Sequence, residues 1–325
     1  MFRKRYGINE LKDGQFIDDI FVVKIKKTMS RYRDGYYFNL LLSDNSGKTI
    51  DYTYWGPNDE AKVKLIYNSI KNDSIVHVQG KVSIYKNKLR ITTNEPNIIE
   101  VLKEGQYREE DFIKPARRDI EEMYNALKKT IDCVENKDIK TLLNNIFYDK
   151  EIENKFKRHP GSIEIHHNWI GGLLQHTLEV LDYCMLSKKH FPGLDSDLLI
   201  AGSLLHDIGK IEELEMTTRI KGTEKGQLIG HLPIGMMFVS KKIDEINGFD
   251  NDLKNKILHM IVSHHGKLEY GAPKEPMFPE ALAVYYADEI SAKMAEITEF
   301  IKNSKDDTED SFMYSKRNGK NIFLR

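Results

Sequence analysis

The hydrophobic pattern of the chain changes near residue 105, and this change limits what the chain can fold into. Before that point, apolar residues recur at every second position, as in strands that bury one face. Beyond it, they recur at the spacing of helices that bury one side. A polar stretch, 106–118, separates the two patterns. Because 325 residues can bury a core on each side, the sequence predicts two domains joined by a linker.

The first domain, residues 1–105, is predicted to form a small barrel. A helix is expected at Asp59–Ile70, after the third strand. Five strands with a helix between the third and fourth are typical of an oligonucleotide-binding (OB) barrel. The strands are expected at Ile20–Met29, Tyr36–Ser43, Lys48–Trp55, Ser74–Tyr85 and Lys88–Thr93.

The second domain, residues 119–303, is predicted to be all-α, which makes the whole chain an α+β multidomain protein. Its helices are expected at Asp119–Cys133, Lys137–Tyr148, Glu151–His159, Gly172–Leu186, Asp195–Ile208, Pro233–Ile246, Asp252–His265 and Pro279–Asn303. The tail, 304–325, is charged and then ends in the apolar run Ile322-Phe323-Leu324. That run is expected either to dock or to fray, and it leaves self-association into a homo-oligomer open.

The chain carries few signals of an oxidising compartment or a membrane. Its two cysteines, Cys133 and Cys184, lie far apart, which argues against a disulfide scaffold. Met1–Gly14 has no apolar core of the kind a secretory signal needs. The longest apolar stretch, Leu198–Leu205, is too short to cross a bilayer. We therefore expect a cytoplasmic protein without a membrane partner.

Histidines are concentrated in the second domain. Ten of the eleven lie after residue 158, and nine fall between 166 and 265. His206 stands beside Asp207 at the end of a predicted helix that is apolar nearly all round, so the helix is expected at the centre of its domain. A buried carboxylate beside an imidazole is costly without a cation, and the negative carboxyl end of a helix also favours one. The pair therefore predicts a metal site.

Further side chains of the kind that bind metals lie on other predicted helices or at their ends. Facing helices build a metal site when each contributes one or two such residues to the centre of a bundle. Imidazole and carboxylate ligands without thiolate suit manganese, iron, zinc or cobalt. The additional ligands expected here are His176, His231, His264, His265 and Asp288.

The order His…His-Asp…His…His-His…Asp resembles the signature of the HD-domain metal phosphohydrolases in their two-metal form. Three segments, 166–177, 263–272 and 287–294, resemble the YhaM-type 3′→5′ exoribonucleases in particular. The chain end from Gly319 to Phe323 is also similar to theirs. Members of that family carry an OB domain ahead of the HD domain, so the resemblance spans nearly the whole chain.

The resemblance implies an enzyme that hydrolyses single-stranded RNA, with DNA as a second polymer, to 5′-mononucleotides through a metal-activated hydroxide. Manganese is the first expectation, with iron, cobalt and zinc as alternatives. Lys210, one helical turn past the His-Asp pair, is expected to contact a phosphate oxygen. One metal is assigned to His176, His206, Asp207 and Asp288, and the second to His231, His264 and His265, with Asp207 as the catalytic bridge.

The first domain has features of a nucleic-acid surface. It carries 18 Lys and Arg against 13 Asp and Glu, and such an excess attracts phosphates, although solvated surfaces carry similar charge. Strand aromatics stack on bases, although alternation turns about half of them inward. The candidates are Arg31, Arg33, Tyr37, Trp55, Lys81 and Arg90. In the second domain, His166 and His167 are candidate phosphate contacts, with an ordinary polar loop as the alternative.

Two other functions stay open at this point. A nucleotide or cyclic-dinucleotide phosphohydrolase would use the same ligands. The cyclic-dinucleotide enzymes of the HD-GYP type carry Gly-Tyr-Pro after the double histidine, and this chain has Gly271-Ala272-Pro273 instead. The second alternative is a non-catalytic protein that binds single-stranded nucleic acid and uses metal only to stabilise its fold.

Overall fold

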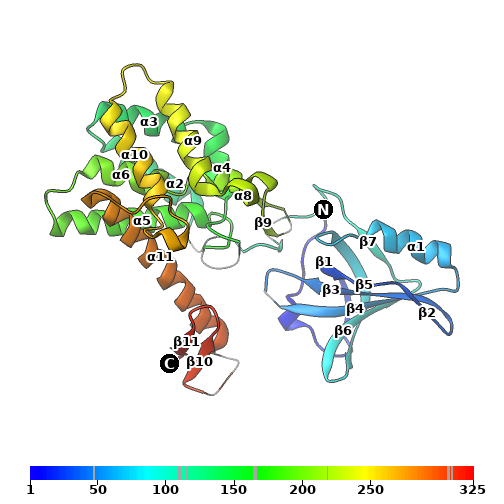
Figure 1. Ribbon diagram of the computed structural model, residues 1–325. Helices are drawn as coiled ribbons and strands as arrows, with labels where there is room; N and C mark the ends of the chain where they lie inside the picture. The colour runs from blue at the N-terminus through cyan, green and yellow to red at the C-terminus, as the bar shows by residue number, and fades with distance from the viewer. Residues whose placement is uncertain are drawn as a thin grey trace. The chain divides into compact units, whose positions relative to one another are not determined.

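The computed structural model describes residues 1–46, 48–108, 111–114, 116, 118–163, 167–217, 219–305, 308 and 310–325 (Figure 1). The chain forms two compact units, and each has a hydrophobic core of its own. The first comprises Met1–Lys114 and Thr217–Arg219, and the second comprises Pro115–Met216 and Ile220–Arg325. Among the described residues, no helix combines the length and the apolar character needed to span a bilayer.

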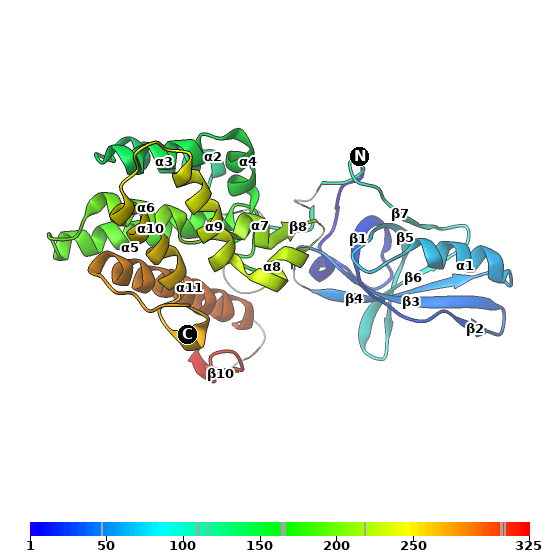
Figure 2. The ribbon, with the colours of Figure 1, turned by 45° about the horizontal axis from the view of Figure 1, so that its top comes forward.

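The first unit is an OB-like barrel, as the sequence predicts (Figure 2). Its elements are η1 (Ile8–Glu10), β1 (Phe16–Lys26), β2 (Ser30–Tyr32), β3 (Gly35–Ser43), β4 (Thr49–Gly56), α1 (Glu60–Ser69), β5 (Ile75–Tyr85), β6 (Lys88–Asn94) and β7 (Ile99–Val101). Five strands pair in the order β1-β3-β4-β6-β5, and β5 pairs again with β1, which closes the sheet on itself. Helix α1 lies between the third and fourth of these strands along the chain.

Alternation along the strands sorts the aromatic residues of the barrel. Phe38, Tyr52 and Tyr54 are buried in the core. Tyr37 and Trp55 have the opposite parity and are only partly buried. The pairing of β3 with β4 places Tyr37 opposite Trp55 and Phe38 opposite Tyr54. Side-chain alternation therefore leaves two of these five rings on the outer face of the barrel.

The first unit also contains features that the sequence does not predict. Strands β2 and β7 have only three residues each, too few for a period-2 pattern to stand out. Beyond β7, Phe112 packs with Ile20, Val22 and Leu102 in a small cluster of buried residues. This packing extends the first unit to Lys114, into the stretch predicted as linker.

The second unit is mainly helical. Each predicted helix is present, with ends that differ by a few residues. The helices are α2 (Ile120–Asp132), α3 (Lys137–Phe147), α4 (Lys150–Arg158), α5 (Gly172–His190), α6 (Ser196–Leu205), α7 (Lys210–Glu213), α8 (Glu224–Ile229), α9 (His231–Asp244), α10 (Asn251–Ser263), η3 (Leu268–Tyr270) and α11 (Pro279–Ser304). Side chains that accept backbone N–H groups fix the starts of α2, α3, α4, α6 and α10, and they belong to Asp119, Asn136, Asp149, Asp195 and Asp250.

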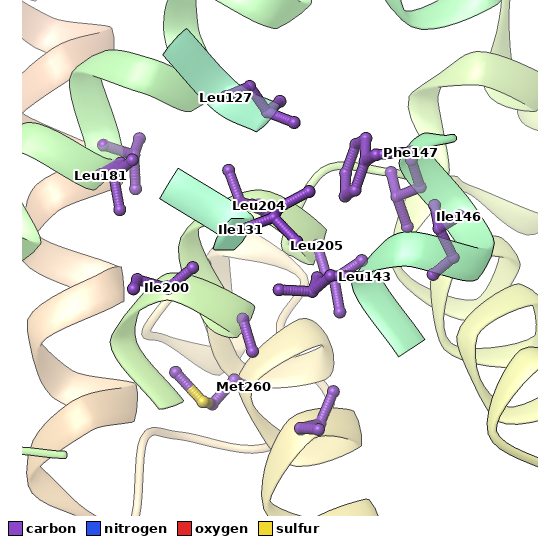
Figure 3. Packing of buried hydrophobic residues seen from close by; sticks show 14 of the residues in the cluster. Leu127, Ile131, Leu143, Ile146, Phe147, Leu181, Ile200, Leu204, Leu205 and Met260 are labelled. Carbon is purple, nitrogen blue, oxygen red and sulfur yellow. The ribbon is translucent and has the colours of Figure 1, made fainter. Parts of the chain in front are cut away.

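Helix α6 lies at the centre of this unit because it is apolar on all sides. Every residue of Leu198–Leu205 is buried. Leu204 and Leu205 belong to the same packed cluster as Met260 of α10 (Figure 3). A Cβ added at Gly202 would lie 2.0 Å from Met260 Cε, so the glycine permits this close packing. Helices α5 and α11 also pack against α6 (Figures 1 and 2). Because the buried helix ends at Leu205, it delivers the next two residues into the interior.

Several short elements complete the second unit. Helices α7 and α8 and the strands β8 (Leu214–Met216) and β9 (Ile220–Gly222) follow α6. The chain end forms a hairpin of β10 (Phe312–Ser315) and β11 (Lys320–Phe323). Ile322 and Leu324 are buried whereas Phe323 between them is exposed, so two of the three residues of the apolar run dock.

Candidate metal centre

All seven predicted ligands meet inside the helical unit. Helix α5 carries His176, the turn after α6 carries His206 and Asp207, α9 begins at His231, the turn after α10 carries His264 and His265, and α11 carries Asp288. Six of the seven form two groups of three, and within each group the atoms that could bind a metal lie within 4.8 Å of one another. The first group is His176, His206 and Asp288, and the second group is His231, His264 and His265.

Asp207 lies between the two groups. Its Oδ2 lies 3.5 Å from His176 Nε2 and 3.4 Å from His206 Nε2. Its Oδ1 lies 3.6 Å from His231 Nε2 and 3.5 Å from His264 Nε2. Each carboxylate oxygen therefore faces a different group. A carboxylate in this orientation can serve two neighbouring cations at once, as two-metal hydrolytic sites require.

In each of the five imidazoles, Nδ1 faces an oxygen atom of the protein and Nε2 faces the centre. Two rings donate to backbone carbonyls near helix ends, His264 to Ile261 O at 2.7 Å and His206 to Ser203 O at 2.8 Å. The other three contacts are each 3.0 Å long: His176 with Ser291 Oγ, His231 with Glu213 Oε1, and His265 with Tyr270 O. Carbonyl and carboxylate oxygens only accept, and the hydroxyl of Ser291 donates its own proton to Glu179, so Nδ1 carries the proton and Nε2 presents a lone pair to the centre. Such outer hydrogen bonds are typical of metal-binding histidines.

The atoms that face the centre fit divalent cations. Asp207 Oδ1 and His264 Nε2 are buried, and neither makes a hydrogen bond to another described residue. Nε2 atoms also approach in pairs, His176 to His206 at 3.3 Å and His231 to His265 at 3.2 Å. Facing lone pairs repel, and buried polar atoms without partners are costly, so both features favour a cation in each group. Imidazole nitrogen and carboxylate oxygen are the donors that transition-metal ions accept.

Burial and neighbouring charges set the protonation states. Burial lowers the pKa of His176 to about 4 and also lowers the pKa of His264, so both rings are neutral near pH 7. Burial alone would raise the pKa of Asp207, but the adjacent ammonium of Lys210 outweighs it and holds that pKa well below its usual range. Neutral imidazoles and an ionised carboxylate are the forms that bind metal.

Lys210, the predicted phosphate contact, lies at the edge of the centre. Its Nζ lies 2.6 Å from Asp207 Oδ2 and donates to Gly161 O at 2.8 Å. Together with His231, it lines a pocket of about 630 Å³. The lysine therefore neutralises part of the charge of Asp207 and presents its ammonium to the pocket.

Glu213 supports the second group and is not predicted from the sequence. Its Oε1 accepts hydrogen bonds from the backbone N–H and from the Nδ1–H of His231, both at 3.0 Å. Glu213 lies at the end of α7, three residues after Lys210. Glu212 stands one residue closer to the His-Asp pair in the sequence but pairs with Lys225, so the sequence alone does not single out Glu213.

A second network supports the first group. Ser291 Oγ accepts from His176 and donates to Glu179 Oε2 at 2.8 Å. Ser291 and Glu179 stand three residues after Asp288 and His176, and this i,i+3 spacing on a ligand-bearing helix is the signal that identifies them. His167 Nε2 lies 3.0 Å from Glu179 Oε2.

His167 is therefore part of this support, and its side chain is buried. The phosphate contact considered for it from the sequence stays a prediction. Burial would raise the pKa of Glu179, but His167 outweighs it and lowers that pKa to about 2. His166, the other candidate in this segment, lies outside the described residues.

The barrel carries an aromatic cluster on the outer face of β3 and β4. The rings of Tyr37 and Trp55 stack with centroids 5.0 Å apart, and Tyr32 meets Trp55 edge-on at 4.9 Å. The guanidinium of Arg90 lies 4.4 Å from the centre of the Tyr85 ring. The structure therefore brings the rings of Tyr37 and Trp55 together on the outer face of the barrel. The other candidate cations, Arg31, Arg33 and Lys81, are exposed on β2, the turn after it and β5.

Comparisons with known proteins agree with this architecture. The family model of the HD domain matches residues 173–293, a range that contains all seven ligands. The 3′-5′ exoribonuclease YhaM of Geobacillus sp. (strain WCH70) is 30% identical over 302 residues, which cover 92% of this chain and 89% of that protein. The protein of the same name from Bacillus subtilis (strain 168) is 30% identical over 288 residues, 89% of this chain and 88% of that protein.

A likeness among solved structures is much weaker. The OB domain of a Thermoplasma acidophilum protein is similar to 30% of this chain over 86% of its own length, at 10% identity and a TM-score of 0.24.

The helical domain, with Asp207 between two groups of metal-binding side chains, defines the class of the HD-domain metal phosphohydrolases, which bind divalent metal. With 30% identity over nearly the full length of both chains, the protein belongs to the YhaM family of 3′-5′ exoribonucleases.

Proposed function

We propose that this chain is a metal-dependent 3′→5′ exonuclease that hydrolyses single-stranded RNA, and DNA as a second polymer, to 5′-mononucleotides. The observation that carries the proposal is Asp207, with one oxygen toward each group of imidazoles. Relatives that match along nearly their whole length are named 3′-5′ exoribonucleases, which supports RNA as the substrate.

In this proposal the seven ligands hold two divalent ions, with manganese first and iron, cobalt or zinc accepted by the same donors. When bound, such ions activate water and neutralise charge on the phosphoryl oxygens. Asp207 joins the two groups, and Lys210 offers its ammonium to a phosphate oxygen. Glu213 and Ser291 keep their imidazoles turned toward the centre.

The barrel is proposed to hold the strand without strict sequence preference. Trp55 and Tyr37 provide a stacked surface on which bases can lie, and stacking accepts every base. The cations proposed to contact the backbone phosphates are Arg31, Arg33, Lys81 and Arg90.

Oligonucleotides labelled at either end test the proposal, in Mn²⁺ and in EDTA. We expect release of the 3′ label as a mononucleotide, stepwise shortening of the 5′-labelled strand, and no reaction in EDTA. Asp207→Ala should lose both metal and hydrolysis, whereas Asp182→Ala, an exposed aspartate of α5, should keep both. Cleavage at interior linkages, or activity that is unchanged in EDTA, would contradict the proposal.

The same protein preparation separates the alternatives. A nucleotide or cyclic-dinucleotide phosphohydrolase would turn over those small substrates faster than RNA. A protein that only binds nucleic acid would hold the strand but show no turnover with manganese, iron, cobalt or zinc. Metal analysis of the purified protein would identify the ion and count the occupied sites.

A further inference from the structure

The pocket of about 630 Å³ beside the metal centre involves the C-terminal hairpin. Its wall includes Lys210 and His231 of the centre, Gln227 of α8, and Arg317 from the turn between β10 and β11. Pockets of about 300–1,000 Å³ hold small ligands, so this pocket has room for a nucleotide unit. A residue close to the chain end therefore lies in the same pocket as the residues around Asp207.

Hydrogen bonds to α11 fix the position of Arg317. Its Nε lies 3.2 Å from Glu296 Oε1, and Asn318 Nδ2 donates to the same oxygen at 3.0 Å. Asn318 also donates to Ser315 Oγ at 3.0 Å, which closes the turn. The side chain of Glu296 is only 11% exposed, so the residue that anchors Arg317 is itself largely buried.

Arg317 keeps donors for a ligand. The contact with Glu296 engages Nε, and the two terminal nitrogens carry the other four N–H donors of a guanidinium. The side chain is 56% exposed, so those donors can be reached from solvent. Lys210, the other cation among the described residues of the pocket wall, already pairs with Asp207.

We propose that Arg317 binds a backbone phosphate of the substrate strand, the phosphate on the 5′ side of the scissile one. This inference rests on the proposed function, in which the scissile phosphate occupies the metal centre. A planar guanidinium matches phosphate oxygens with paired N–H donors, which an ammonium cannot do. The hairpin β10–β11 is then part of the substrate site.

Binding of an RNA that cannot be cleaved tests this assignment without turnover. Its 3′-terminal linkage carries a methylene group in place of the 3′-bridging oxygen, so the phosphate charge remains. Each phosphate contact to a single strand adds about 0.7 to the slope of log affinity against log salt. In Mn²⁺, Arg317→Ala should lower that slope by about 0.7 and weaken binding about tenfold at low salt.

Matched variants separate this role from a structural one. Lys316→Ala, an exposed neighbour, should change neither the slope nor the affinity. Arg317→Lys should keep the slope and lose part of the affinity, because the charge stays and the paired donors go. Bis(p-nitrophenyl) phosphate, which has a single phosphate, should be hydrolysed by Arg317→Ala at the wild-type rate, while KM for RNA rises about tenfold at unchanged kcat.

A wild-type salt slope in Arg317→Ala would overturn the assignment, and so would an equal loss on the single-phosphate substrate. If the wild-type protein binds RNA but never cleaves it, the proposed function fails and the salt slopes still decide the role of Arg317. If the wild-type protein does not bind RNA, both proposals fail.

Discussion

The two groups of the metal centre should be separable by mutations outside the ligand set. Glu213 contacts His231 of the second group, and Ser291 contacts His176 of the first group. Glu213→Gln keeps an oxygen acceptor but removes its charge, and Ser291→Ala removes the acceptor. We expect the first substitution to weaken one metal site and the second to weaken the other.

The size of the effect follows from the hydrogen bonds. Glu213 Oε1 accepts two bonds of 3.0 Å from His231, one from the backbone and one from the ring. A bond to a charged group contributes about 1.5–3 kcal/mol, against about 0.5–1.5 kcal/mol for a neutral one. Only the bond to Nδ1 orients the ring, so the amide should lose about 1–1.5 kcal/mol of orienting energy, which is about a 5- to 12-fold loss of metal affinity. Outer hydrogen-bond partners of metal ligands typically contribute about 10–100-fold.

Calorimetric titration of Mn²⁺ into metal-free protein would measure both sites. The wild-type protein should bind two ions, Glu213→Gln should keep one site at wild-type affinity, and Ser291→Ala should keep the other. Glu212→Gln is the matched control, because Glu212 pairs with Lys225 away from the ligands. The double variant of Glu213 and Ser291 should show both losses.

Three results would refute this reasoning. Equal weakening of both sites by one substitution would mean that the groups do not bind separate ions. Unchanged affinity in both variants would mean that these hydrogen bonds do not orient the rings. A single ion in the wild-type protein would remove the basis for Asp207 as a bridge.

Two further predictions concern the barrel and an ion pair on helix α4 of the helical unit. Trp55→Ala should weaken single-strand binding by about 1–3 kcal/mol with little loss of stability, since Trp55 is only partly buried. Fluorescence anisotropy would measure the affinity for a single strand, and a wild-type affinity would contradict this prediction. Lys157 lowers the pKa of Glu153, so this pair stabilises the fold above the ordinary carboxyl pKa of about 4.3 and loses that contribution as pH falls through the lowered pKa. Urea titrations at a series of pH values would measure the free energy of unfolding. In Glu153→Gln this free energy should fall less steeply as the pH is lowered, and an unchanged pH dependence would refute the pairing.

The sequence predicts the long elements of the fold and misses the short ones for a physical reason. Helices such as α2 and α3 repeat the apolar spacing over three turns, so the period stands out. Helix α7 and the strands of the hairpins have three or four residues, and no period can be read from so few. Their positions depend on tertiary contacts, as with Arg317 and Glu296.

The sequence also predicts which side chains gather at the candidate metal centre, whereas only the family resemblance predicts how they divide into two groups. Consecutive residues inside a helix point about 100° apart, which would separate His264 from His265. Helix α10 ends at Ser263, and in the turn that follows, both rings face the same group. The orientation of Asp207, with one oxygen toward each group, depends on the packing around it, and no spacing encodes that.

The ends of two helices explain why the imidazoles point inward. The last carbonyls of a helix have no partner within the helix. Ser203 O near the end of α6 accepts from His206 Nδ1, and Ile261 O near the end of α10 accepts from His264 Nδ1, in both cases three residues apart. The same helix termini carry partial negative charge, which favours cations beside them. One feature of the fold, the place where each helix stops, therefore orients the ligand and stabilises the ion that it binds, and an extra turn at either end would remove both effects.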